Sequence, residues 1–215
     1  MDFVDLASMC APEVHSDTMR RIVQVESSFN PYAIGIVGAR LERQPRSLDE
    51  AVRTAATLEA GGYNYSIGLA QINRQHFGRF GLTPETGFDV CANLRTSSQI
   101  LRECFERAGQ TRDEQGALQA AFSCYYSGNF STGFAEGYVG RILAVTDAAA
   151  PIPSQTPVVP QLKARADQRA PLRVIPVAPR SKPATPERAA TKTPAPRLRA
   201  ASPEPDNAPT SALLF

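Results

Sequence analysis

Apolar residues recur at helical spacing, three or four residues apart, in several segments of the first two thirds of the chain. Met19, Ile22 and Val23 lie on one face of a predicted helix over residues 17–29, which Asn30-Pro31 brings to an end. The same pattern predicts four more helices, most of them followed by glycine or opened by a capping motif. These helices span residues 47–60, 93–108, 111–127 and 134–145.

Strand periodicity is weak by comparison. Alternating residues favour only a short hairpin built from residues 33–46 and 62–67. The next segment is Ser66-Ile67-Gly68-Leu69-Ala70-Gln71-Ile72-Asn73. Small residues come first in it, and we expect a helix to start at the amide-bearing residues 71–73 that follow. The predicted fold class is therefore mainly α, with at most a small β-hairpin.

Composition divides the chain near residue 148. Residues 1–147 hold all 14 glycines, all four cysteines and every aromatic residue except Phe215, as expected of one compact domain. Residues 148–215 hold 14 of the 18 prolines and few large apolar side chains. We expect this second region to be a disordered tail rich in Pro, Ala and Arg, because it cannot bury enough surface to offset its chain entropy.

Charge divides in the same place. Residues 1–150 carry 13 Arg and 17 acidic residues, whereas the tail carries 10 Lys or Arg and 4 acidic residues. A basic arm can bind anionic polymers or acidic proteins. The tail has no aromatic residues interleaved for base stacking, so we expect no nucleic-acid binding and favour a solubilising role for its charges.

No apolar run reaches the ~20 residues that a membrane-spanning helix needs. The first nine residues include Asp2 and Asp5 and lack the basic start and apolar stretch of a signal peptide. Taken alone, the N-terminus therefore favours the cytoplasm.

The four cysteines leave two interpretations open. Their spacing does not match a zinc site, so they are either buried free thiols or structural disulfides of an oxidising compartment. In a plain antiparallel hairpin Cys104 and Cys124 would be about 12 Å out of step, beyond the ~7 Å limit for a bridge. We therefore favour a bridge between Cys10 and Cys91, and leave Cys104 and Cys124 less certain.

One carboxylate stands out from the helical pattern. Glu26 falls on the same face as Met19, Ile22 and Val23, in the last turn of its helix. Apolar surroundings and the negative end of the helix dipole both disfavour the ionised form. The sequence therefore predicts a carboxylic acid with a raised pKa, suited to general acid catalysis, although a lone Glu near a helix end is more often simply solvated.

Three motifs in order resemble the soluble lytic transglycosylase family. They are Glu26-Ser27-Ser28-Phe29-Asn30-Pro31, the segment over residues 66–73 and Ser123-Cys124-Tyr125-Tyr126-Ser127-Gly128-Asn129. The family pattern is a catalytic Glu followed by Ser, then Gly-Leu-x-Gln-Ile, then Ala-Tyr-Asn-x-Gly. Tyr126 replaces the usual Asn, Cys124 the usual Ala, and Ala70 a common Met.

The resemblance covers about residues 10–145 and implies a goose-type, lysozyme-like fold that acts on peptidoglycan glycan strands. Glu26 would be the one catalytic carboxylic acid, with no metal and no cofactor. Ser27, Gln71 and Tyr125 would stabilise the reacting sugar, unless they respectively bond the backbone, lie at the surface and pack in the core. Further candidates to line the saccharide cleft are Tyr65, Asn73 and Tyr126.

The helix over residues 47–60, the Cys-Ala-Pro segment at Cys10 and the Pro-rich tail resemble the subgroup of this family found in type IV secretion systems. That subgroup implies a periplasmic enzyme that opens the wall for envelope components of a secretion apparatus, by an export route that the N-terminus does not reveal. A different class of function is a non-catalytic scaffold subunit that binds peptidoglycan and recruits secretion components.

Overall fold

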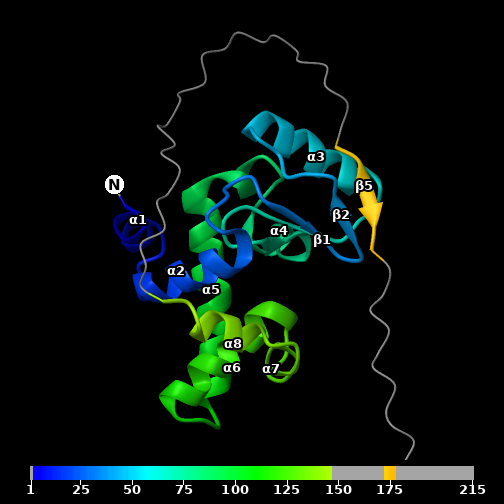
Figure 1. The fold of residues 1–215 in the computed structure, drawn as a ribbon. Coiled ribbons are helices and arrows are strands. Elements are labelled where there is room, and N and C mark those ends of the chain that lie inside the picture. The colour runs from blue at the N-terminus through cyan, green and yellow to red at the C-terminus, as the bar shows by residue number, and fades with distance from the viewer. Residues whose placement is uncertain (1, 147–171, 178–215) are drawn as a thin grey trace, which may run out of the picture. The chain divides into compact units, whose positions relative to one another are not determined.

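The computed structural model describes residues 2–146 and 172–177. Figure 1 shows a sheet and α3 at one end, and α6, α7 and α8 at the other, with α5 running between them. The helices are α1 (Phe3–Cys10), α2 (Ser16–Ser27), α3 (Leu48–Ala60), α4 (Phe77–Phe80), α5 (Val90–Gly109), α6 (Glu114–Ser127), α7 (Thr132–Ala135) and α8 (Tyr138–Leu143), with 3-10 turns η1 (Arg74–His76) and η2 (Thr86–Phe88).

The fold class is confirmed as mainly helical, and α2, α3, α5 and α6 match predicted helices. Helix α1 was not predicted. It begins with a capping box between Asp2 and Asp5, and its buried face carries Phe3 and Ala7. The predicted helix over residues 134–145 is instead two short helices, because Gly137 adopts φ 73° between α7 and α8.

The sheet is larger than the predicted hairpin. Its five short strands are antiparallel in the order β4-β3-β1-β2-β5. They are β1 (Ile34–Ile36), β2 (Ala39–Leu41), β3 (Tyr65–Ile67), β4 (Ile72–Asn73) and β5 (Val174–Pro176). The helix start predicted at residues 71–73 is wrong, because Gln71 takes a positive φ of 49° that reverses the chain and pairs Ile72 with Ile67.

Strand β5 corrects the prediction that the whole of residues 148–215 is disordered. Leu41 lies opposite Val174, and Ala39 lies opposite Pro176. Leu172, just before the strand, is buried in the core. A run of four large apolar residues within six positions explains why this part of the tail is structured. The rest of the predicted tail lies outside the described residues.

Both cysteine pairs form disulfides, Cys10–Cys91 as favoured and Cys104–Cys124 as well. The hairpin estimate for the second pair was wrong. The Cα atoms of Cys104 and Cys124 are 5.8 Å apart, and Ala108 packs in one cluster with Ala120. Both pairs are centred in sequence on residue 114. The chain therefore reverses direction near the start of α6, rather than at Gly109 as the estimate assumed.

Candidate active site

A cavity of about 780 Å³ separates the sheet from the helices, and Glu26 lies in its wall. Strands β1, β3 and β4 contribute one wall, which we call the sheet wall: Gly35, Ile36, Ser66, Ile72 and Asn73, with Val37, Asn64 and Gln71 beside them. The opposite side, the helical wall, contains Glu26 from α2, residues of α5 and α6, and Thr132 and Glu136 from α7 and the turn after it. The cavity therefore brings together segments more than 100 residues apart.

Glu26 is placed by the abrupt end of α2. The helix ends at Ser27, and Ser28 and Phe29 follow with positive φ angles of 51° and 62°. Phe29 turns back into the core, where its ring packs edge-on against Phe3 at 5.1 Å. This turn leaves the Glu26 side chain half-buried in the cavity wall.

Burial raises the pKa of Glu26 from 4.5 to about 7. Two neighbours act in the opposite direction. The Tyr138 hydroxyl donates a 2.6 Å hydrogen bond to Oε1 of Glu26, and the positive charge of Arg141 also favours the carboxylate. Desolvation has a larger effect on the pKa than these two neighbours together, so Glu26 holds its proton near neutral pH. The bond from Tyr138 keeps the side chain oriented. This is the protonation state predicted from the helical face of Glu26.

Tyr125 joins the two walls. Its hydroxyl donates to the carbonyl oxygen of Ala70 at 2.6 Å and lies 2.9 Å from Oγ of Ser97 on α5. Burial, and then the negative charge of Glu26, raise the pKa of Tyr125 well above its usual value. Tyr125, predicted to stabilise the reacting sugar, lies in the cavity wall, and its hydroxyl is already bonded to protein atoms.

Gln71 and Asn73, two of the predicted site residues, lie in the sheet wall. The Gln71 amide nitrogen donates to the carbonyl oxygens of Ala33 and Gly68, at 3.0 and 2.9 Å. The Asn73 amide nitrogen donates to the Asn64 side chain, and its Oδ1 accepts from the backbone N–H of Gln75. Both amides are therefore held in place by bonds to other atoms of the protein.

Two other predicted site residues face elsewhere. Tyr65 has a fully buried side chain, and its hydroxyl donates to Glu59 at 2.9 Å. The prediction that Tyr65 lines the cleft is wrong, because side chains alternate along β3 and Ser66 faces the cavity instead. Ser27 does not line the cavity, and its hydroxyl donates to the carbonyl oxygen of Val23 at 3.2 Å.

Tyr126 lies in the cavity wall, 41% exposed. Its ring stacks on Tyr138 with 4.6 Å between centroids, and its hydroxyl donates to Glu136 at 2.7 Å. Tyr126 therefore covers one face of Tyr138, the partner of Glu26, and is the member of the pair that lines the cavity. An exposed aromatic surface of this kind suits the apolar face of a sugar ring.

Sequence reasoning missed Tyr138 and Asn93. Asn93, only 1% exposed, accepts from the backbone N–H of Ala70 and donates to the carbonyl oxygens of Ile67 and Gly87. Gly68 has φ 79°, and a Cβ there would lie 2.3 Å from Nδ2 of Asn93. The glycine of the second motif is therefore required by the loop that Asn93 holds.

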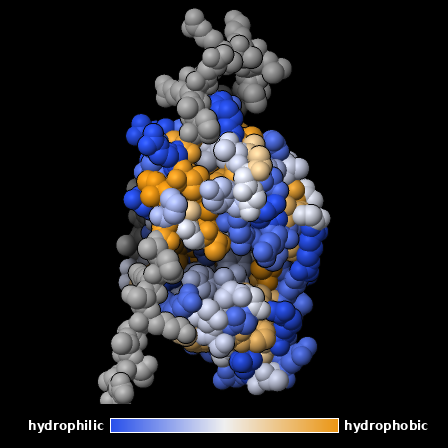
Figure 2. All heavy atoms as spheres, turned by 90° about the vertical axis from the view of Figure 1, so that its right-hand side faces the viewer, coloured by the Kyte–Doolittle hydropathy of each residue, from blue (hydrophilic) through white to orange (hydrophobic). Residues whose placement is uncertain are grey.

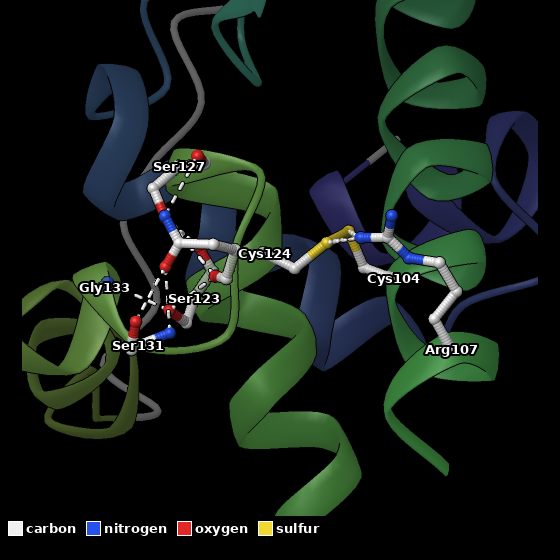
Figure 3. The surroundings of a disulfide bond; sticks show 8 residues. Cys104, Arg107, Ser123, Cys124, Ser127, Ser131 and Gly133 are labelled. Atoms are coloured by element: carbon white, nitrogen blue, oxygen red, sulfur yellow. Dashed lines mark hydrogen bonds between the residues drawn. A yellow bond between two sulfur atoms is a disulfide. The ribbon is translucent and has the colours of Figure 1, made fainter. Parts of the chain in front are cut away.

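The third motif builds the bend between α6 and α7 (Figure 3). Ser123 is fully buried, donates to the carbonyl oxygen of Asn129 and accepts from the backbone N–H of Gly133. The next residue, Cys124, forms the disulfide with Cys104, and Arg107 donates a hydrogen bond to the sulfur of Cys124 at 2.6 Å (Figure 3). The disulfide fixes α6 against α5, which sets the position of Tyr125.

The described part of the chain contains no cluster of three or more His, Cys, Asp or Glu residues able to hold a metal ion. It also contains no helix that is long and apolar enough to cross a bilayer.

The sequence model of the family described as "Transglycosylase SLT domain" matches residues 6–142. The chain belongs to the SLT transglycosylase family. The match spans α1 to α8 almost completely, so it includes every cavity residue described above.

Several curated relatives are similar to this SLT protein over most of its length. The "Type IV secretion system protein virB1" of Brucella suis is 49% identical over 175 residues, which cover 78% of this chain and 72% of that protein. The protein of the same name from Brucella abortus is 53% identical over 152 residues, or 67% and 64% of the two chains. "Protein virB1" of Agrobacterium tumefaciens is 34% identical over 153 residues, or 70% and 63%. No solved structure gives a significant match.

Proposed function

We propose that the chain is a peptidoglycan lytic transglycosylase that cleaves the β-1,4 bond between N-acetylmuramic acid and N-acetylglucosamine. The observation that carries this proposal is Glu26, a carboxylic acid whose pKa is about 7, held by Tyr138 in the wall of a 780 Å³ cavity. The match to the SLT family supports the same chemistry.

In the proposed first step Glu26 donates its proton to the glycosidic oxygen, and the bond from that oxygen to C1 of the muramic acid breaks. Positive charge then develops on C1 and the ring oxygen. Glu26, now a carboxylate, removes the proton from the C6 hydroxyl of the same sugar. The C6 oxygen bonds to C1 and closes a 1,6-anhydro ring, so Glu26 regains its proton and no water is consumed.

This cycle needs one carboxyl group to act first as acid and then as base. A pKa near 7 suits both roles, because neither protonation state is strongly disfavoured at neutral pH. The nucleophile belongs to the substrate and is held beside C1, so its effective concentration is high. Ordinary glycosidases use a second carboxyl group for this purpose.

Five other residues have proposed substrate roles. Gln71, Asn73 and Tyr126 lie in the cavity wall, where they can contact the sugar rings. Tyr125 holds Ala70 of the sheet side against α5 and so sets the width of the cavity. A direct role for Ser27 has less support, since its hydroxyl bonds its own helix.

We also propose that the enzyme acts in the periplasm, on the wall, for assembly of a type IV secretion system. The support is the printed names of the Brucella relatives together with two disulfides, which suit an oxidising compartment. Envelope components of that apparatus would be its protein partners.

Mass spectrometry of the products released from purified sacculi tests the activity. We expect muropeptides ending in 1,6-anhydro-muramic acid, with intact disulfides in the protein used. Products with reducing muramic acid ends would indicate a hydrolase of lysozyme type. Binding to sacculi without release of any product would indicate the non-catalytic scaffold instead.

A further inference from the structure

The tail segment that forms β5 lies on the sheet like a bound peptide. β1 to β4 come from residues 34–73, whereas β5 pairs with the outer edge of β2 from much later in the chain. Val174 of β5 lies 133 residues after Leu41, its partner in β2. Leu172 and Val174 contact the core, while Arg173, Pro176 and Val177 are exposed. Figure 2 shows apolar side chains gathered on the face where β5 lies.

The backbone of β2 supplies the contacts that an added strand needs. The N–H of Glu42 donates to the carbonyl oxygen of Arg173, and the N–H of Val177 donates to that of Gly38, each at 3.0 Å. Leu172 is 7% exposed and shares a cluster with Leu41. Backbone bonds along an edge, with a pocket for one apolar side chain, are the features of peptide recognition by strand addition.

Pro176 fits this arrangement without breaking it. Backbone N–H groups alternate in direction along a strand, and that of Val177 points to β2. The nitrogen of Pro176 therefore points away from β2, and the missing N–H lies on the free outer edge of β5. A proline there costs no bond to β2 and removes a donor that another strand could use.

We propose that the edge of β2 is a binding site for an extended apolar peptide, and that residues 172–177 of the same chain are its ligand. Covalent attachment supplies this ligand at a high effective concentration. If the chain is cut between residues 147 and 171, the C-terminal fragment stays bound to the catalytic unit. The inference does not depend on the proposed enzymatic activity.

Hydrogen exchange on the uncut full-length chain tests the docking. We expect the amides of Glu42 and Val177 to be protected, and Ile175→Pro to lower that protection at least about tenfold, because the Ile175 N–H also points to β2. Pro176→Ala is the matched control and keeps the protection. Equal protection in wild type and Ile175→Pro, or no protection in wild type, would overturn the proposal.

A cut chain tests whether β5 binds as a separate ligand. Residues 155–161 are replaced by a protease recognition sequence, and the folded protein is cleaved and run on size exclusion. We expect the C-terminal fragment to co-elute in wild type and Pro176→Ala, and to separate in Ile175→Pro and Leu172→Asp. Separation in wild type, or co-elution in every variant, contradicts the proposal. An uncut wild-type dimer that becomes monomeric in Ile175→Pro would assign the edge to a second copy and also contradict it.

Discussion

The two walls of the cavity are built differently. On the helical wall, Glu26 accepts a hydrogen bond from Tyr138, which is 112 residues away in sequence, and burial raises the pKa of the acid. On the sheet wall, Gln71 and Asn73 are amides whose bonds run to nearby backbone and side chains. Under the proposed function, we expect proton transfer to take place on the helical wall, and the sheet wall to contribute to saccharide recognition without taking part in proton transfer.

The largest effect is expected at the acid itself. Glu26→Gln keeps the shape of the side chain but cannot donate a proton to the glycosidic oxygen, so release of anhydromuropeptides from sacculi should fall at least about 1,000-fold. Circular dichroism should show an unchanged fold. Turnover at the wild-type rate in this variant would show that Glu26 is not the acid of the reaction.

The same variant has a stability signature. The folded carboxyl holds its proton to about pH 7, whereas the unfolded one loses it near 4.5, so in that window the folded state binds more protons. Wild-type stability must therefore fall as pH rises through the window. Glu26→Gln has no such titration. Its free energy of unfolding relative to that of wild type, measured with denaturant, should therefore be about 3 kcal/mol higher at pH 8 than at pH 4.

The next largest effect concerns the loop that joins the walls. Asn93→Ala leaves the N–H of Ala70 and the carbonyl oxygens of Ile67 and Gly87 without their partner, and should lower the free energy of unfolding by about 3 kcal/mol. Asn64→Ala, which removes one half-buried acceptor, is the control and should cost less than about 1 kcal/mol. Equal losses would mean that Asn93 does not organise the loop.

Tyr138→Phe should change the pH profile as well as the rate. The hydroxyl lowers the pKa of Glu26, so its removal should move the alkaline limb of kcat/KM to higher pH. Loss of orientation should also lower kcat/KM about tenfold at its optimum. Tyr126→Phe keeps the ring stack and loses only the bond to Glu136, so its pH profile should match wild type.

The smallest effect should come from the sheet wall. Asn73→Ala removes an amide from the cavity and should raise KM for glycan strands several-fold, without moving the pH profile. Asn73→Ser retains an oxygen that can cap η1 and serves as the control for the turn. A shift of the alkaline limb in either variant would break the division between the walls.

Local pattern revealed the acid but not its surroundings. Glu26 was predictable because its helical face and the Asn30-Pro31 exit both lie within one short segment. Tyr138 and Asn93 were not, because each acts on residues distant in sequence and neither type is unusual in a helix.

The sheet was underestimated for a related reason. Its strands are two or three residues long, too short to show a period of two, and β5 is separated from its partner by more than 130 residues. The error over Tyr65 followed, because only a correct strand assignment shows that Tyr65 and Ser66 face opposite ways.

Direct titration of Glu26 tests the central claim most closely. In protein labelled with ¹³C at glutamate carboxyl groups, the resonance absent from Glu26→Gln identifies this side chain, and its chemical shift can be followed with pH. A midpoint near pH 7 is the result expected of a desolvated acid bonded to Tyr138. A midpoint at or below 4.5 would show a solvated carboxylate and contradict the account.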